Sequence, residues 1–173
     1  MEFTKEQNRA LCEKYPFLDP DRRWGRKNCP DRDEHMPLSP EGAQEWDYRY
    51  TDLDSMPDGW RIGFGEQLCE ELKAELERAG LLDQYRILQI KEKYGSLRWY
   101  DSGNTSAGYD ILEKYERISA RTCICCGKPA TRITSGWISP YCDACCPEGP
   151  SVTIDEYYKE ALVDVLLRRR EAE

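Results

Sequence analysis

Apolar residues recur at helical spacing in several parts of the chain. The strongest stripe begins at Trp60 and repeats every fourth residue as far as Leu76, and Gly80 follows at a position where helices commonly end. Weaker stripes over residues 4–15 and 109–120 predict two further helices. We expect these helices to pack their apolar faces against a common core.

Two short patterns mark the beginnings of the terminal helices. Thr4 is followed three residues later by Gln7, and Thr153 is followed in the same way by Glu156. In such a capping box each side chain accepts a hydrogen bond from the other residue's backbone N–H. The second pattern predicts a C-terminal amphipathic helix.

Residues 85–93 and 97–100 have the composition of strands. The first run contains isoleucine, leucine and tyrosine, the second contains leucine, tryptophan and tyrosine, and the intervening Tyr94-Gly95-Ser96 is typical of a tight turn. The sequence therefore predicts an antiparallel hairpin between the two long helices.

Cysteine spacing adds a candidate metal site. Six of the nine cysteines lie between residues 123 and 146, and they include two C-x2-C pairs separated by 15 residues. This spacing is typical of a zinc site with the four ligands Cys123, Cys126, Cys142 and Cys145. Four thiolates complete a tetrahedral zinc shell, so we expect a structural site. Cys125 and Cys146 lie beside the pairs, and substitution by either one as a ligand stays an open alternative.

Disulfide bonds are the other interpretation of these thiols. No apolar segment like a secretory signal begins the chain, so we expect a reducing compartment such as the cytoplasm, where disulfides do not persist. Zinc is therefore the predicted cofactor.

The sequence thus indicates an α+β fold, in which a small antiparallel sheet is packed with three or four helices and joined to a four-cysteine zinc ribbon. We divide it into an N-terminal helix with an acidic, proline-rich irregular segment (1–59), a helix–hairpin–helix core (60–121), the zinc ribbon (122–150) and the C-terminal helix (151–173).

Composition excludes several classes of protein. The 173 residues carry a net charge of −8, and no run approaches the roughly 20 apolar residues that span a bilayer. Nonspecific binding to nucleic acid through bulk charge is disfavoured, because a negative protein repels phosphate. A single histidine makes a Ser-His-Asp triad an improbable source of activity.

The negative charge is concentrated in residues 31–58. This segment holds nine Asp and Glu residues against only Arg32 and Arg49, so it carries seven of the eight net charges. It is either a solvated loop or a surface that mimics phosphates and docks in a basic channel. The docking interpretation selects as partner-binding residues Glu45, Asp47, Tyr48, Tyr50, Asp52 and Asp54.

The hairpin also has two interpretations. Its basic residues, which include the candidate partner-binding residues Lys91 and Lys93, accompany aromatic ones, a combination that suits single-stranded nucleic acid. On strict alternation, however, both lysines share a face with Ile87, whereas Tyr94 belongs with Ile90. The basic and aromatic sets then do not coincide, which favours core packing.

Three stretches carry a resemblance: Met56–Trp60 leading into Glu66–Cys69, the run Gln89–Tyr100, and Cys123–Cys145 with its internal Gly136-Trp137. Over about residues 45–146 the chain resembles small, mostly uncharacterised proteins encoded by bacteriophages and prophages. The resemblance implies a phage accessory protein and brings no catalytic residues with it.

Together these features lead us to expect a non-enzymatic phage protein that binds and inhibits a host defence factor, such as a CRISPR-type nuclease. Its partner would be a host protein contacted through the acidic surface, and no membrane would be involved. Two alternatives stay open: a zinc-ribbon module that binds nucleic acid or assists transcription, and a small hydrolase or nuclease that uses carboxylates.

Overall fold

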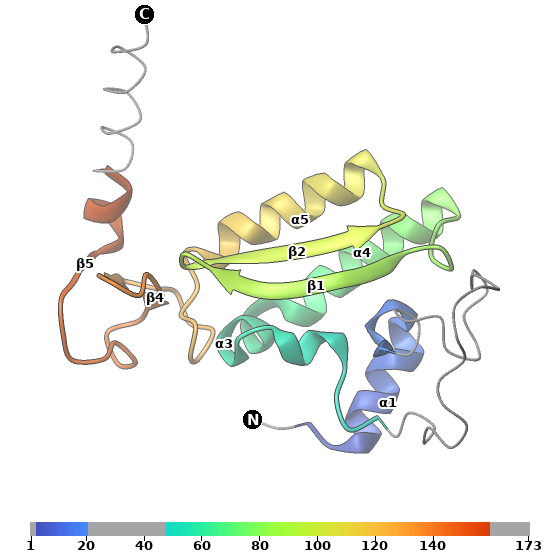
Figure 1. Ribbon diagram of the computed structural model, residues 1–173, viewed down its shortest axis with the longest axis horizontal. Helices are drawn as coiled ribbons and strands as arrows, with labels where there is room; N and C mark the ends of the chain where they lie inside the picture. Colours follow the sequence, from blue (N-terminus) through green and yellow to red (C-terminus); the bar gives the residue numbers. More distant parts are fainter. Residues whose placement is uncertain (1–2, 21–47, 160–173) are drawn as a thin grey trace, which may run out of the picture.

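A computed structural model describes residues 3–20 and 48–159. Its central element is an antiparallel hairpin of β1 (Arg86–Lys93) and β2 (Ser96–Ser102), as Figure 1 shows. Tyr94 and Gly95 form the turn with φ values of 52° and 76°, the left-handed values of a two-residue type I′ turn. The predicted hairpin is confirmed.

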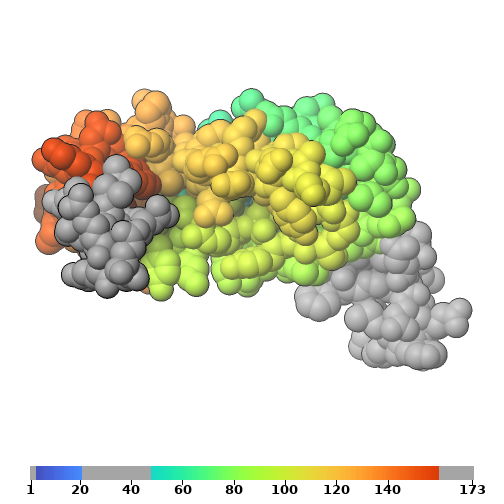
Figure 2. All heavy atoms as spheres, turned by 90° about the horizontal axis from the view of Figure 1, so that it is seen from above, coloured from blue at the N-terminus to red at the C-terminus, as the bar shows by residue number. Residues whose placement is uncertain are grey.

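Two long helices cover one face of the hairpin, while no helix of the described residues lies on the other face along most of its length (Figure 1). They are α4 (Glu66–Ala79) and α5 (Ser106–Ser119), which pack against each other, and α5 runs along β2. Figure 2 shows α5 in yellow between the light green hairpin and the blue-green α4. None of the helices in the described part of the chain is long and apolar enough to cross a membrane.

The helical stripe that begins at Trp60 supplies much of the core. Its every-fourth members Trp60, Phe64, Leu68, Leu72 and Leu76 are all buried. The segment starts earlier than predicted, with a short turn α3 (Asp58–Trp60) and a π-helical turn η3 (Arg61–Gly65) that lead into α4. Gly80 ends α4 at φ 70°, as its position predicts.

Tertiary packing changes the alternation of strand β1. The register shifts between Ile87 and Gln89, so Leu88 is an extra, bulged residue, and both Ile87 and Ile90 are buried. Lys91 and Lys93 therefore lie on the face opposite Ile87. The strict alternation expected from the sequence is wrong at this point, because the core takes two isoleucines that are three residues apart.

The N-terminal residues pack against the same core. Helix α1 (Lys5–Lys14) has the predicted capping box, followed by the 3-10 turn η1 (Pro16–Leu18). A second 3-10 turn, η2 (Asp52–Ser55), lies against β1. The hydroxyl of Tyr15 donates a hydrogen bond to Glu70 of α4 at 2.7 Å, which ties α1 to the helical layer.

A second sheet lies beyond the hairpin turn, at one end of the molecule (Figure 1). Strand β3 (Arg132–Thr134) pairs with β4 (Pro140–Tyr141) on one side and with β5 (Ser151–Thr153) on the other. The sequence predicts a zinc ribbon over residues 122–150 but not the strand β5 that joins this sheet. A helix begins at Ile154 behind the predicted capping box, and the rest of this helix prediction falls on residues 160–173, outside the described part.

These elements form an α+β fold with a cysteine-bearing module, which confirms the predicted class.

Candidate metal centre

Two tight turns present the cysteine side chains. In the first, the N–H of Gly127 donates to the carbonyl of Cys123 at 3.0 Å, and Gly127 has φ 75°. In the second, the N–H groups of Cys145 and Cys146 donate to the carbonyl of Cys142. Each turn brings two thiols of a C-x2-C pair to one side of its loop.

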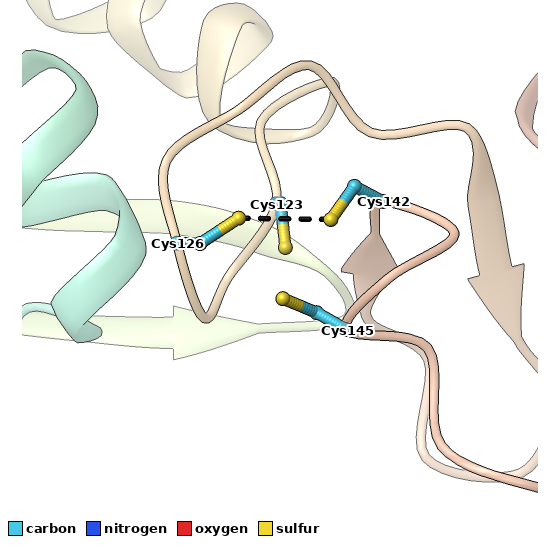
Figure 3. Close-up of side chains that lie close together, drawn as sticks. All are labelled: Cys123, Cys126, Cys142 and Cys145. Carbon is cyan, nitrogen blue, oxygen red and sulfur yellow. Dashed lines mark hydrogen bonds between the residues drawn. The ribbon is translucent and has the colours of Figure 1, made fainter.

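The two turns face each other, so that the four sulfurs converge (Figure 3). The ligand atoms of Cys123, Cys126, Cys142 and Cys145 all lie within 4.8 Å of one another, and the sulfurs of Cys126 and Cys142 are 3.6 Å apart. Sulfurs about 2.3 Å from a tetrahedral zinc would be about 3.8 Å apart. The four cysteines therefore can hold a metal ion.

The surroundings of Cys123 favour its thiolate. Burial opposes ionisation, but the backbone N–H groups of Cys142, Cys126 and Cys125 point at the sulfur and hold its pKa at about 7. Hydrogen bonds to Cys142 and Cys126, together with burial, raise the pKa of Cys145. The cluster thus contains one thiol that readily loses its proton, and other thiols hydrogen-bonded around it. A metal cation that binds here would displace the remaining protons.

The neighbouring cysteines do not join the cluster. Cys125 is exposed at the surface of its turn. Partial desolvation of its sulfur raises its pKa, and so does the negative charge of Cys123 and Cys126. Cys146 also lies outside the group of four. All eight cysteines of the described residues are reduced thiols, so the geometry selects the predicted ligand set rather than a disulfide arrangement.

Glycines seat the first cysteine turn directly on the helical core. A Cβ on Gly59 would clash with the carbonyl of Cys123 and come within 2.6 Å of the Ile124 carbonyl carbon. A Cβ on Gly63, four residues later, would lie 3.0 Å from the carbonyl oxygen of Gly127. Backbone therefore packs on backbone here, which only residues without side chains allow.

Hydrogen bonds fix the same contact. The N–H of Gly59 donates to the carbonyl of Ile124, and the indole N–H of the fully buried Trp60 donates to the carbonyl of Thr122, both at 2.9 Å. The sequence analysis missed this role of Gly59, Trp60 and Gly63. The spacing of the two glycines, which places them on one side of a helical turn, is the signal that would have found it.

The predicted partner-binding residues are scattered. Glu45 and Asp47 lie outside the described residues. Tyr48 is half-buried and packs against the core, whereas Tyr50 is 46% exposed.

Asp52 and Asp54 need a correction. Asp52 is only 4% exposed, and the carboxylate of Asp54 accepts hydrogen bonds from the N–H and hydroxyl of Thr51 and forms an ion pair with the buried Arg61. Asp54 thus stabilises η2 and its contact with η3, while Asp52 is buried in η2. They do not belong to the open acidic surface that the sequence predicts, because folding uses them internally.

Lys91 and Lys93 lie where a partner can reach them. The Nζ atom of Lys91 is 5.0 Å from the ring centroid of Tyr100, and that of Lys93 is 5.4 Å from the ring centroid of Tyr94. Each lysine thus has an aromatic ring beside it, against the expectation from strict alternation: Lys91 meets Tyr100 across the strands, and Lys93 meets Tyr94 of the turn.

Comparisons with protein-family models, with curated proteins and with solved structures gave no match. The resemblance to phage-encoded proteins accordingly stays a prediction.

Proposed function

We propose that the protein is a zinc-ribbon protein that acts by binding a partner. In this proposal one zinc ion, held by Cys123, Cys126, Cys142 and Cys145, fixes the C-terminal module on the helical core. The convergence of four sulfurs from two facing turns is the observation that supports it. The metal has a structural role, because it holds together a surface that a partner recognises.

The donor set favours zinc. Tetrahedral sites made of four thiolates hold zinc or iron, whereas calcium and magnesium take oxygen ligands. The two C-x2-C pairs match the usual spacing of structural zinc ligands. A catalytic zinc would keep one position for water, and four sulfurs leave none.

The identity of the partner has to be argued from surfaces other than the metal centre. Inhibition of a host nuclease through an acidic surface is the prediction that follows from the phage resemblance. The placement of Asp52 and Asp54 does not favour it. Many carboxylates of the described residues are also neutralised in ion pairs, including Glu66, Glu70, Glu71, Glu75, Glu77, Glu113 and Glu116.

Elemental analysis tests the zinc proposal. We expect about one zinc per chain after purification without added metal, and retention of that zinc through dialysis against a weak chelator. The test is plasma mass spectrometry of the protein together with its visible absorption spectrum. A colourless protein with no zinc would contradict the proposal. A red protein with stoichiometric iron would show that the bound metal is iron rather than zinc.

A further inference from the structure

We infer that the outer face of the β1–β2 hairpin binds single-stranded nucleic acid. We define the outer hairpin face as Gln89, Lys91, Lys93, Arg98 and Tyr100, the side of the two strands opposite Ile90 and Leu97. This inference rests on the proposed function, because it names the partner of the protein whose fold the zinc holds. Four observations carry it.

The first is charge without a counterion. Neither Lys91 nor Lys93 has a carboxylate partner in the described part of the chain; Lys91 donates instead to the side chain of Gln89 at 2.7 Å. Other cations of the described residues do have one, namely Lys14, Lys73, Lys114, Arg61, Arg78, Arg98, Arg117 and Arg121. Lys91 and Lys93 thus place two cations without a carboxylate partner among the described residues close together on the hairpin.

The second is a repulsive cross-strand pair. Lys91 lies directly opposite Arg98 in the register of the hairpin. Like charges at such positions destabilise a sheet, and strands that serve only to fold avoid them. Arg98 turns its guanidinium toward Glu116 of α5, which leaves the half-buried Lys91 as the positive charge of this pair that has no carboxylate partner among the described residues. An anion on this face would relieve the remaining repulsion.

The third is a set of open aromatic rings beside these lysines. Tyr94 is 71% and Tyr100 is 44% exposed, and each ring has a lysine ammonium over it. Tyr94 also occupies a left-handed turn position that asparagine or glycine adopts more easily. Folding alone therefore gives no reason for a bulky aromatic residue at this turn.

The fourth is the continuation of the face onto the cysteine module. A Cβ on Gly95 would lie 3.3 Å from the Cγ2 atom and the carbonyl oxygen of Ile138, so the hairpin turn rests on the segment that carries Trp137. Trp137 is 78% exposed, the largest exposed fraction among the large apolar side chains of the described residues. The segment that carries the exposed Trp137 ring therefore lies next to the hairpin turn that carries Tyr94 and follows Lys93.

Rings and lysines together favour a single strand over other anions. Unpaired bases offer faces for stacking and phosphates for the lysines, whereas a duplex hides its base faces and an acidic peptide has none. Helix α4, which carries five glutamates, lies on the other side of the hairpin, in the helical layer (Figure 1).

The test is fluorescence anisotropy of a labelled oligothymidylate with the zinc-loaded full chain at low salt. We expect binding that weakens with added salt. The double variant Lys91→Glu and Lys93→Glu should bind at least about 10-fold more weakly, with a salt slope reduced by about 0.7 for each lysine that contacts a phosphate. Tyr94→Asn should weaken binding roughly 10-fold by removing a stacked ring while leaving the melting temperature unchanged or higher.

The matched control reverses two cations elsewhere. The double variant Lys73→Glu and Arg117→Glu makes the same charge change on α4 and α5, and we expect it to keep most of the binding. Zinc content and melting temperature are measured for every variant. A variant that loses its zinc counts against the proposed function, whereas a variant that keeps its zinc and its stability but binds poorly reports on the hairpin face alone.

Three results would overturn the inference. They are a zinc-loaded wild type that does not bind at low salt, equal weakening by the control variant, and competition by polyglutamate as effective as competition by unlabelled oligothymidylate. The last result would assign the face to acidic polypeptides instead.

Discussion

Cys123→Ser is expected to release the zinc and to lower the free energy of unfolding by more than about 4 kcal/mol at saturating metal. The sulfur of Cys123 is buried, and backbone N–H groups stabilise its thiolate. A serine hydroxyl stays protonated and is a poor zinc ligand, so the free energy of metal binding no longer contributes to folding. Urea denaturation followed by tryptophan fluorescence, with and without a chelator, measures the loss.

Cys125→Ser is the matched control for this variant. Cys125 lies two residues away and is exposed, so its replacement should keep the zinc and change the stability by less than about 0.5 kcal/mol. Wild-type protein stripped of metal should melt like Cys123→Ser. If Cys125→Ser also lost its zinc, Cys125 would have to replace one of the four ligands.

Gly59→Ala is expected to destabilise the protein by about 3 kcal/mol or more, although it adds a single methyl group and improves helix propensity. The new Cβ would collide with the backbone of Cys123 and Ile124, and neither can rotate away as a side chain would. The first cysteine turn would have to move off α3, so we also expect faster loss of zinc to a chelator.

Gly65→Ala separates this clash from general effects of replacing glycine. Gly65 lies in the same helical segment with a right-handed backbone, and its added Cβ would meet the side chains of Leu53 at 3.5 Å and Arg61 at 3.7 Å, both ordinary contacts. We expect it to be neutral or to stabilise by up to about 1 kcal/mol. Equal destabilisation by both substitutions would refute the backbone-on-backbone contact between α3 and the metal module.

The metal site could be predicted from the sequence because the spacing of its ligands is a local feature of the chain. A C-x2-C pair brings its two thiols together within one turn, so spacing alone selects Cys123, Cys126, Cys142 and Cys145. The hairpin and the start of α1 were predictable for the same reason, since turn and capping preferences depend on a few consecutive residues.

What the sequence could not predict depends on contacts between distant segments. The bulge at Leu88 arises because the core takes both Ile87 and Ile90, and a two-residue alternation gives no position for an extra residue. The charge of Asp54 looked available to a partner, yet Arg61 binds it from a neighbouring turn. Composition records the number of charges in a segment, whereas folding decides which of them face solvent.

The metal centre and the outer hairpin face meet at the hairpin turn. Gly95 rests on Ile138 and Pro140, and Pro140 in turn accepts a hydrogen bond from the N–H of Ile124 in the first cysteine turn. A zinc ion that fixes the first cysteine turn would therefore also fix the position of the hairpin turn that carries Tyr94. In the proposed function, this contact is the path by which a closed metal site would support a binding surface.

The coordination shell of the bound metal tests the central claim most directly. X-ray absorption at the zinc edge of the purified, metal-loaded protein should give four sulfur neighbours at about 2.3 Å and no oxygen or nitrogen neighbour. A shell of three or fewer sulfurs with a water oxygen would contradict a closed structural site and would point to a metal with chemistry of its own.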